Sequence, residues 1–309
     1  MGTKHRVAGI AALIGMSASL LLTGCGSSAG AATKGTVSIV AAENQYGDVA
    51  SQIGGKYVSV TSIESNPNAD PHSYEVSPSV AGAVSSAGIL IENGLGYDGY
   101  MSKLESAASG TRRYVIDVQR LLRLPDSTPN PHLWYKPSTM PLVAKALVAD
   151  LSRLQPAHLV YFRSNKQRFL ASLMAWRREL VAFARAHQGT AVSTTEPVAD
   201  YMLSAAGLRN LTPFSFQADI MNGVDPAPQA IGFEDNLFSH HRVKTLVYNK
   251  QVTDALTQSF IAQARSAGIP VVGVYETMPA PGYDYQTWML AELRDLNLAL
   301  TKGISTQKL

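Results

Sequence analysis

The longest periodic segment of the 309-residue chain is PAHLVYFRSNKQRFLASLMAWRRELVAFARAHQG, residues 156–189. Large apolar side chains recur in it at three- and four-residue steps, which is the spacing of one helix face. Pro156 suits the first turn of a helix, and Gly189 suits its C-terminal end. About thirty helical residues span roughly 45 Å at 1.5 Å per residue, which is longer than a small domain. We therefore predict one long rigid helix, residues 155–188, joining two halves of the molecule; an ordinary long packing helix is the alternative.

Short apolar runs alternate with longer helical patterns on both sides of this segment, which favours βα units around mostly parallel sheets. The predicted strands are 37–42, 57–63, 88–92 and 114–118 before it, and 190–194, 210–213, 243–249 and 269–275 after it. The predicted helices are 45–54, 77–87, 98–108, 138–154, 197–206, 227–241, 253–267 and 284–302. The predicted fold class is α/β, with an N-terminal lobe at 36–154 and a C-terminal lobe at 189–309. Each lobe has a mostly parallel central sheet with flanking helices.

Two loops present a histidine directly after a proline, in NPNADPHSYE at 66–75 and in NPHLW at 130–134. The proline fixes φ and keeps the preceding residue out of the helical region, so His72 and His132 are offered from stiff, extended loops. Glu196 and Glu276 each follow an apolar, strand-like run, and ligands of parallel sheets gather beyond the carboxyl ends of the strands. We predict that these four side chains form one site for a divalent metal ion.

Two imidazoles and two carboxylates suit zinc, manganese or iron(II), and they offer no sulfur ligand to a thiophilic ion. A divalent cation with two ionised glutamates is neutral, so the occupied site buries no unpaired charge. Without the cation the two carboxylates repel each other, and metal binding is therefore expected to release protons and to weaken in acid.

Three further side chains are candidates for orienting the ligands. Asp70 and Glu75 flank His72 and could accept the proton on its non-ligating nitrogen, or could simply face solvent. Asn44, just past the first predicted strand, is a similar candidate. His240 and His241 are adjacent and point about 100° apart on a helix, so they cannot chelate as a pair, although one of them could replace Glu196.

The first 24 residues have the pattern of a secretory signal peptide. Lys4 and Arg6 precede an uncharged run with an apolar centre, and no stop-transfer charges follow. The run ends in LTGC at 22–25, which resembles the lipobox of bacterial lipoproteins, in which the cysteine becomes the acylated N-terminus. We therefore expect a lipid anchor on Cys25, and the Gly-, Ser- and Ala-rich residues 25–35 as a flexible tether.

Composition narrows the class of partner. The chain is 46% hydrophobic and 16% charged, as in a globular protein. Its net charge is +3, and removal of Lys4 and Arg6 with the leader leaves +1, which argues against a nucleic-acid partner. Cys25 is the only cysteine, so its acylation leaves no thiol for a disulfide, and stability must come from the core. We further expect a monomer.

The ordered set of motifs resembles the zinc- and manganese-binding solute-binding lipoproteins of metal ABC importers, bacterial solute-binding protein family 9. The motifs are DPHSYE at 70–75, NPHLW at 130–134, TEP at 195–197 and VGVYET at 272–277, after a lipobox, and the resemblance runs from about residue 37 to 300. It implies two α/β lobes bridged by one long helix, limited closure, and a metal in the cleft between the lobes. It also carries the family's four ligands onto His72, His132, Glu196 and Glu276.

The sequence departs from the best-known zinc members of this family in two ways. Its third ligand position is Glu196 rather than a histidine, and no His-rich loop lies between His72 and His132. Two carboxylates favour the harder manganese ion, whereas the Irving–Williams order favours zinc in raw affinity, so both metals remain candidates.

The predicted function is capture of zinc or manganese outside the cytoplasmic membrane and delivery to an ABC permease, with no chemical turnover. Two alternatives remain open. An exported zinc-dependent hydrolase could activate water with two histidines and a carboxylate, although no H-E-x-x-H helix is present. A binding protein for an organic solute could use the same four residues as hydrogen-bonding groups.

Overall fold

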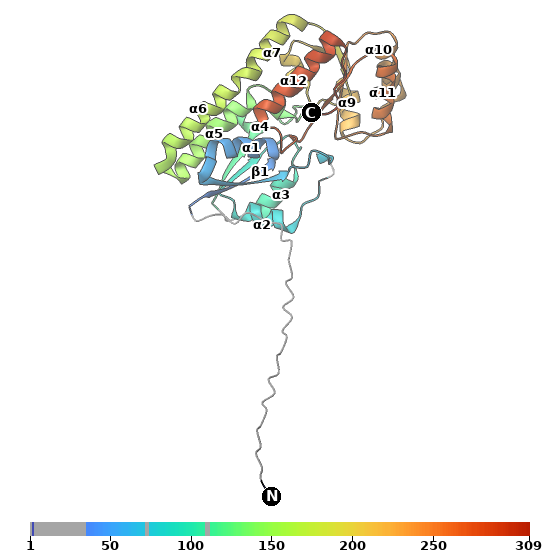
Figure 1. The fold of residues 1–309 in the computed structure, drawn as a ribbon. Coiled ribbons are helices and arrows are strands. Elements are labelled where there is room, and N and C mark those ends of the chain that lie inside the picture. Colours follow the sequence, from blue (N-terminus) through green and yellow to red (C-terminus); the bar gives the residue numbers. More distant parts are fainter. Residues whose placement is uncertain (1, 3–34, 72–73, 109–111) are drawn as a thin grey trace. The chain divides into compact units, whose positions relative to one another are not determined.

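The computed structural model describes residues 2, 35–71, 74–108 and 112–309 (Figure 1). The predicted signal peptide apart from residue 2, together with Cys25 and His72, lies outside these residues. All of the described helices and strands belong to one compact unit, residues 32–309.

The N-terminal lobe is built on a four-stranded parallel sheet with strand order β2-β1-β3-β4. Its strands alternate with helices, as the sequence predicts. The short helix α4 was not predicted, and the bounds of the other elements agree with the prediction to within one or two residues. The elements are β1 (Val37–Glu43), α1 (Asn44–Gly54), β2 (Val58–Glu64), α2 (Pro78–Ser86), β3 (Ile89–Glu92), α3 (Tyr100–Ala107), β4 (Tyr114–Asp117), α4 (Val118–Leu121) and α5 (Thr139–Leu154).

The C-terminal lobe repeats this topology, because its parallel strands have the order β6-β5-β7-β8. The elements are β5 (Ala191–Thr194), α8 (Asp200–Ala205), β6 (Arg209–Asn210), α9 (Phe214–Met221), α10 (Pro228–Ser239), β7 (Leu246–Asn249), α11 (Ala255–Ser266), β8 (Val271–Val274) and α12 (Tyr285–Lys302). The sequence analysis began α8 and β7 three residues early. It did not identify α9, and it placed the strand β6 at 210–213. Both α9 and β6 lie in a stretch where short apolar runs fit the period of a helix as well as that of a strand.

Two consecutive helices, α6 (Leu159–Ser172) and α7 (Met174–His187), lie between the lobes in the chain (Figure 1). The sequence predicts one helix here, and the structure interrupts it at a single residue, Leu173, with no proline or glycine at the break. The break is mild, because the Leu173 N–H still donates to the Phe169 carbonyl at 3.2 Å. The helix α6 packs on α1 and α5, whereas α7 packs on α12. The pair therefore contacts both lobes.

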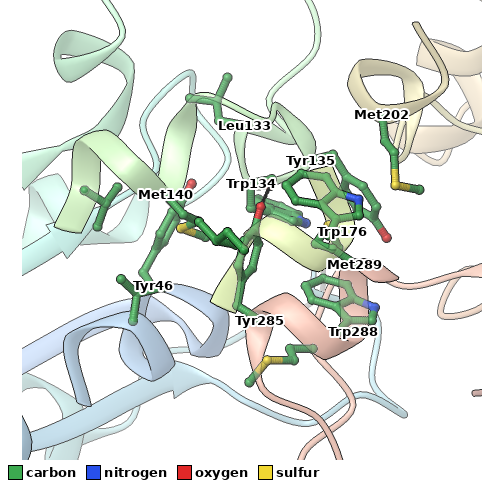
Figure 2. Packing of buried hydrophobic residues seen from close by; sticks show 14 of the residues in the cluster. Tyr46, Leu133, Trp134, Tyr135, Met140, Trp176, Met202, Tyr285, Trp288 and Met289 are labelled. Carbon is green, nitrogen blue, oxygen red and sulfur yellow. Dashed lines mark hydrogen bonds between the residues drawn. The ribbon is translucent and has the colours of Figure 1, made fainter. Parts of the chain in front are cut away.

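The main hydrophobic core continues from one lobe into the other. It includes buried residues of α1, α5, α7, α8 and α12, and three tryptophans are among its largest members (Figure 2). Trp176 of α7 packs edge-on against Tyr285 of α12, with ring centroids 6.2 Å apart. A shared core of this kind opposes large relative movements of the two halves, because dense packing does not deform continuously.

Polar side chains of α1 also bind the segment that follows β8 in the C-terminal lobe. Asn44 makes two hydrogen bonds to the backbone of Met278, donating to its carbonyl at 2.8 Å and accepting from its N–H at 3.0 Å. The other contacts are Gln45 Nε2 to the Glu276 carbonyl at 3.3 Å, the Tyr285 N–H to Asp48 Oδ2 at 2.9 Å, and Gln52 with Gln286 at 3.1 Å. The backbone of 276–286 is thus fastened to the N-terminal lobe. We refer to these contacts as the α1 clasp.

A buried carboxyl group lies in this core, on α12. Burial raises the pKa of Glu292 to about 8. Its Oε1 accepts from Trp288 Nε1 at 2.8 Å and from the Tyr275 N–H at 3.1 Å, and its Oε2 lies 2.6 Å from the Tyr135 hydroxyl. That hydroxyl also lies 2.7 Å from the Tyr275 carbonyl. A protonated Glu292 can donate to the Tyr135 oxygen, which frees the tyrosine proton for the carbonyl.

We expect Glu292→Gln to stabilise the protein at neutral pH, because an amide mimics the protonated acid. The folded pKa of about 8 exceeds the ordinary value of about 4.3, so unfolding releases a proton between these two values and stability falls as pH rises through this window. The variant should gain roughly 3–4 kcal/mol at pH 7 and nothing near pH 4. Urea unfolding at several pH values measures this. Glu179→Gln on α7 is the control, and equal pH dependence of Glu292→Gln and wild type would contradict the assignment.

Candidate metal site

The structure brings two of the predicted ligands together. His132 lies just before a short 3-10 turn (Leu133–Tyr135), and Glu276 lies two residues after the end of β8. The imidazole Nε2 is 3.2 Å from the Glu276 carboxylate Oε2, and both side chains are fully buried. The pair therefore joins a loop of the N-terminal lobe to the carboxyl edge of the other sheet.

Asn130 determines which nitrogen of His132 faces the carboxylate. Its Oδ1 accepts from the His132 backbone N–H at 2.9 Å and lies 2.9 Å from His132 Nδ1. With the proton on Nδ1 donated to Asn130, the Nε2 lone pair points towards Glu276. Two facing electron-pair donors at this distance are stabilised by a cation that both can bind, and this arrangement of second partners is typical of metal-binding histidines.

The Glu276 carboxylate is held by neighbours from both lobes. The Tyr97 hydroxyl donates to its Oε2 at 2.9 Å, and the Asn249 side-chain amide donates to its Oε1. Burial, followed by the charge of Glu276, raises the pKa of Tyr97 well above its usual range, so the hydroxyl keeps its proton as a donor. The carboxylate is thus oriented on both oxygens.

Gln251 fixes the backbone at the same place. Its Oε1 accepts from the N–H groups of Glu276 and Thr277, each at 2.7 Å. Its Nε2 donates to the carbonyl of Ala69 at 2.7 Å. Ala69 belongs to the loop of the N-terminal lobe that leads to His72. One side chain therefore connects the Glu276 backbone with the approach to a second predicted ligand.

Glu196 is buried in the loop after β5, as its predicted role requires, with an exposed fraction of 3%. The residues on either side of it contact the partners of the His132–Glu276 pair. Thr195 Oγ1 accepts from the Asn249 N–H at 3.2 Å, and the Pro197 carbonyl accepts from Asn130 Nδ2 at 2.7 Å. The Glu196 loop is therefore hydrogen-bonded to Asn130 and Asn249, each of which is one of the residues that orient a member of the pair.

Among the described residues, which leave out His72, no group of three or more His, Cys, Asp or Glu side chains is close enough to hold a metal ion. The four-residue site therefore stays a prediction. Asn44 belongs to the α1 clasp and bonds backbone rather than a predicted ligand. His240 and His241 are exposed at the end of α10, in contrast to the buried Glu196 they were considered to replace.

Carboxyl groups gather at the carboxyl edge of the N-terminal sheet, where β1 and β2 end in the paired residues Glu43 and Glu64. Burial, followed by repulsion from Asp98 and Glu64, raises the pKa of Glu43 well above its usual value. Glu64 also lines a cavity of about 260 Å³ with Asp70, Glu75 and Thr277, the residue after Glu276. This acidic lining favours cations over anions near the pair.

Sequence reasoning missed three of the side chains that position Glu276: Tyr97, Asn249 and Gln251. Asn249 could have been found, because it is the last residue of a buried strand, the place where parallel sheets bind ligands. Tyr97 follows Gly94 and Gly96, both at positive φ, and nothing in that local sequence points towards Glu276. Trp134, the last residue of the NPHLW motif, is buried with its ring 5.4 Å from that of His132.

We expect Asn130→Ala to weaken binding of a divalent metal about 10- to 100-fold, because His132 loses the acceptor that orients its ring. Calorimetric titration of the purified protein with Zn²⁺ and Mn²⁺ measures the change. Asn222→Ala is the matched control, since Asn222 is an exposed asparagine that bonds only within its own helix turn. Unchanged affinity in Asn130→Ala would show that His132 is not held through this contact.

Fold and site together define a class: a two-lobed α/β protein with a mixed nitrogen and oxygen pair buried where the lobes meet. The model of one protein family, zinc-uptake complex component A, periplasmic, matches residues 39–299. The chain belongs to this family. The resemblance to zinc- and manganese-binding receptors of ABC importers, seen in the sequence motifs, is thereby confirmed.

Individual relatives agree with the family. The chain is 26% identical over 267 residues to the manganese-binding lipoprotein MntA of Bacillus subtilis, covering 81% of this chain and 83% of that protein. The periplasmic zinc-binding protein TroA of Treponema pallidum has the same fold, with a TM-score of 0.71 at 16% identity over 87% of this chain and all of TroA. A manganese-bound periplasmic metal-binding protein of Candidatus Liberibacter asiaticus, a S38A mutant, gives 0.67 at 18% identity over 86% of this chain and all of that one. These likenesses confirm the predicted fold class. Within the described residues, no helix combines the length and apolarity needed to cross a bilayer.

Proposed function

We propose that this protein is a lipid-anchored, extracytoplasmic receptor that binds one zinc or manganese ion and delivers it to an ABC permease. The observation that carries the proposal is the buried pair in which His132 Nε2 faces the Glu276 carboxylate at 3.2 Å, with each side chain oriented by neutral amides. Family membership supports this reading over the hydrolase and the organic-solute receptor that the sequence also allows. The cation is cargo, and no chemical step is needed.

We assign four ligands to the cation: His72, His132, Glu196 and Glu276. His132 and Glu276 are brought together by the fold, and Glu196 is buried in a loop bonded to their partners. His72 completes the set by its place in the DPHSYE motif, three residues after Ala69, whose carbonyl Gln251 connects to the Glu276 backbone. Two imidazoles and two carboxylates suit both Zn²⁺ and Mn²⁺, so selectivity depends on cavity size and ligand number.

The anchor and the boundaries complete the proposal. Residues 1–24 are a signal peptide, Cys25 carries the lipid, and residues 25–35 form a tether. Residues 155–188 link the two lobes, and the protein is a monomer. The similarity to a Bacillus lipoprotein supports the anchor. Replacing Cys25 by serine should move the protein out of the membrane fraction and remove the acyl mass from its N-terminal peptide.

The test of metal binding uses protein purified without chelator. Elemental analysis and mass spectrometry under native conditions should give one zinc or manganese ion per chain, and competition titration then ranks the two metals. A protein that shows no metal stoichiometry, or one that hydrolyses ester or phosphoester substrates when metal is bound, would contradict the proposal. The first result favours an organic solute, and the second favours an enzyme.

A further inference from the structure

The outward face of α6 and α7 forms one continuous stripe of exposed side chains. They recur at three- and four-residue steps over about 38 Å at 1.5 Å per residue. The members are Val160, Arg163, Ser164, Gln167, Ala171, Met174, Ala175, Arg178, Val181, Ala182 and Arg185. Val160 is 80% exposed, Val181 53% and Met174 45%, which places them among the most exposed large apolar residues of the described chain. We call this set the α6–α7 stripe.

The stripe carries arginines and no acidic residue. Its three arginines form no ion pair among the described residues, and the one glutamate of the two helices, Glu179, lies off the stripe. Residues 155–188 contain six lysines and arginines against this glutamate, a net charge of +5, although the chain after the leader totals only +1. The remainder of that chain is therefore acidic overall, and the positive charge is concentrated here.

The C-terminal half of the stripe borders a groove of about 390 Å³. Its walls are Met174, Arg177, Arg178, Val181, Ala182 and Arg185. Guanidinium groups beside apolar side chains are complementary to a phospholipid headgroup. The phosphate pairs with the guanidinium groups, and the apolar side chains are buried against the adjoining glycerol region.

The tether of the proposed lipid anchor joins the fold at the start of the stripe. Gln155, directly before the turn that leads into α6, donates to the Gly35 carbonyl at 2.6 Å. Only nine residues separate Gly35 from Cys25, so the connection spans at most about 35 Å. An acyl chain on Cys25 therefore keeps this end of the stripe within reach of the bilayer surface.

We propose that the α6–α7 stripe is a membrane-contact surface that binds anionic phospholipid headgroups when the receptor is not engaged with its permease. The inference rests on the proposed lipid anchor, which keeps the stripe close to the membrane, and on the charge of the stripe, which provides affinity for anionic lipid. Each arginine near an anionic bilayer contributes about fivefold in affinity, so three contribute about a hundredfold. Contact of this kind would position the anchored receptor flat on the bilayer.

The test uses the full acylated protein, purified from membranes and reconstituted on vesicles. Met174→Cys is labelled with an environment-sensitive fluorophore, since Cys25 is otherwise the only cysteine. One vesicle set is an equal mixture of phosphatidylglycerol and phosphatidylethanolamine, and the other is phosphatidylcholine. We expect quenching by aqueous iodide to be at least about threefold slower on the anionic set, and this protection to be lost in about 1 M salt, where screening is nearly complete.

Matched variants separate the stripe from net charge. Arg163→Glu, Arg178→Glu and Arg185→Glu together should abolish the protection. Lys103→Glu, Arg242→Glu and Lys244→Glu together make the same charge change at exposed sites elsewhere and should preserve it. A label at Val224→Cys, an exposed residue after α9, should be quenched equally on both vesicle sets. Circular dichroism of each variant verifies folding.

The outcomes distinguish the stripe from the anchor. Equal quenching at position 174 on both vesicle sets, with the protein bound to each, overturns the stripe and leaves the anchor intact. Vesicle flotation in a density gradient tests the anchor separately, and a protein that does not float with phosphatidylcholine vesicles would refute the anchor. In that case flotation with anionic vesicles alone would support lipid binding by the stripe, and no flotation with either would overturn it. If the label at position 174 is protected from iodide only when permease is added, whatever the lipid, the stripe binds a protein partner. That result overturns the membrane proposal.

Discussion

Glu276→Gln is expected to reduce affinity for Zn²⁺ and Mn²⁺ by about a hundredfold to a thousandfold. The change removes one of the two negative charges proposed to balance the cation, while retaining the size of the side chain. The binding free energy of structural zinc sites with four ligands is about 10–16 kcal/mol, so an equal share per ligand is roughly 2.5–4 kcal/mol. Calorimetric titration with each metal, supported by competition with a chelator of known affinity, measures the loss.

The control for this variant is Glu179→Gln, which makes the same chemical change on α7, away from the pair. Its affinity should equal that of wild type. Since the amide at 276 can still accept from Tyr97 or Asn249, the fold should be retained, and thermal unfolding of the metal-free proteins verifies this. If Glu276→Gln bound both metals as tightly as wild type, Glu276 would not be a ligand.

Trp134→Ala should lower the free energy of unfolding by about 3–5 kcal/mol, the usual cost of removing a large buried aromatic side chain. Trp134 is completely buried among large side chains that include Tyr46 (Figure 2). Its ring packs edge-on against those of Tyr46, Tyr97 and His132. A domain of this size should lose roughly 10 °C in its melting temperature. Calorimetry of the metal-free protein gives the value.

Metal binding by the same variant should also weaken, because the resulting cavity lies against the His132 ring. Trp134→Phe is the matched control, since it keeps an aromatic ring at the site and should lose less in both measurements. Among the described residues the indole N–H of Trp134 has no hydrogen-bond partner, so its replacement by a phenyl ring costs no polar contact. If Trp134→Ala lost stability but kept its affinity for metal, the packing of Trp134 would not influence the metal site.

Much of the fold follows from local patterns in the sequence. The alternation of apolar runs and helical repeats predicts eight parallel strands, because the strands are short and buried and the helices between them are amphipathic. The helix α9 and the break at Leu173 do not follow, since each depends on packing against elements distant in the chain. Leu173 itself is a good helix former and fully buried.

The candidate site could be predicted only in part, for a physical reason. Proline before His132 and a strand before Glu276 are local signals, and the structure brings these two residues together. Tyr97 and Gln251 act on Glu276 from other parts of the chain, and only the folded arrangement of both lobes gives them that role. His72 lies outside the described residues, so its place in the site stays a prediction.

The α1 clasp has a consequence for how the cargo leaves. By chain order Glu276 belongs to the C-terminal half, yet Asn44 and Gln45 bind its loop to the other half. Asn249 and Gln251 hold the same residue from the C-terminal lobe, so a permease that pulled the halves apart would have to break the hydrogen bonds on one side of Glu276. The ion would then be left on fewer of the proposed donors, from which transfer is easier.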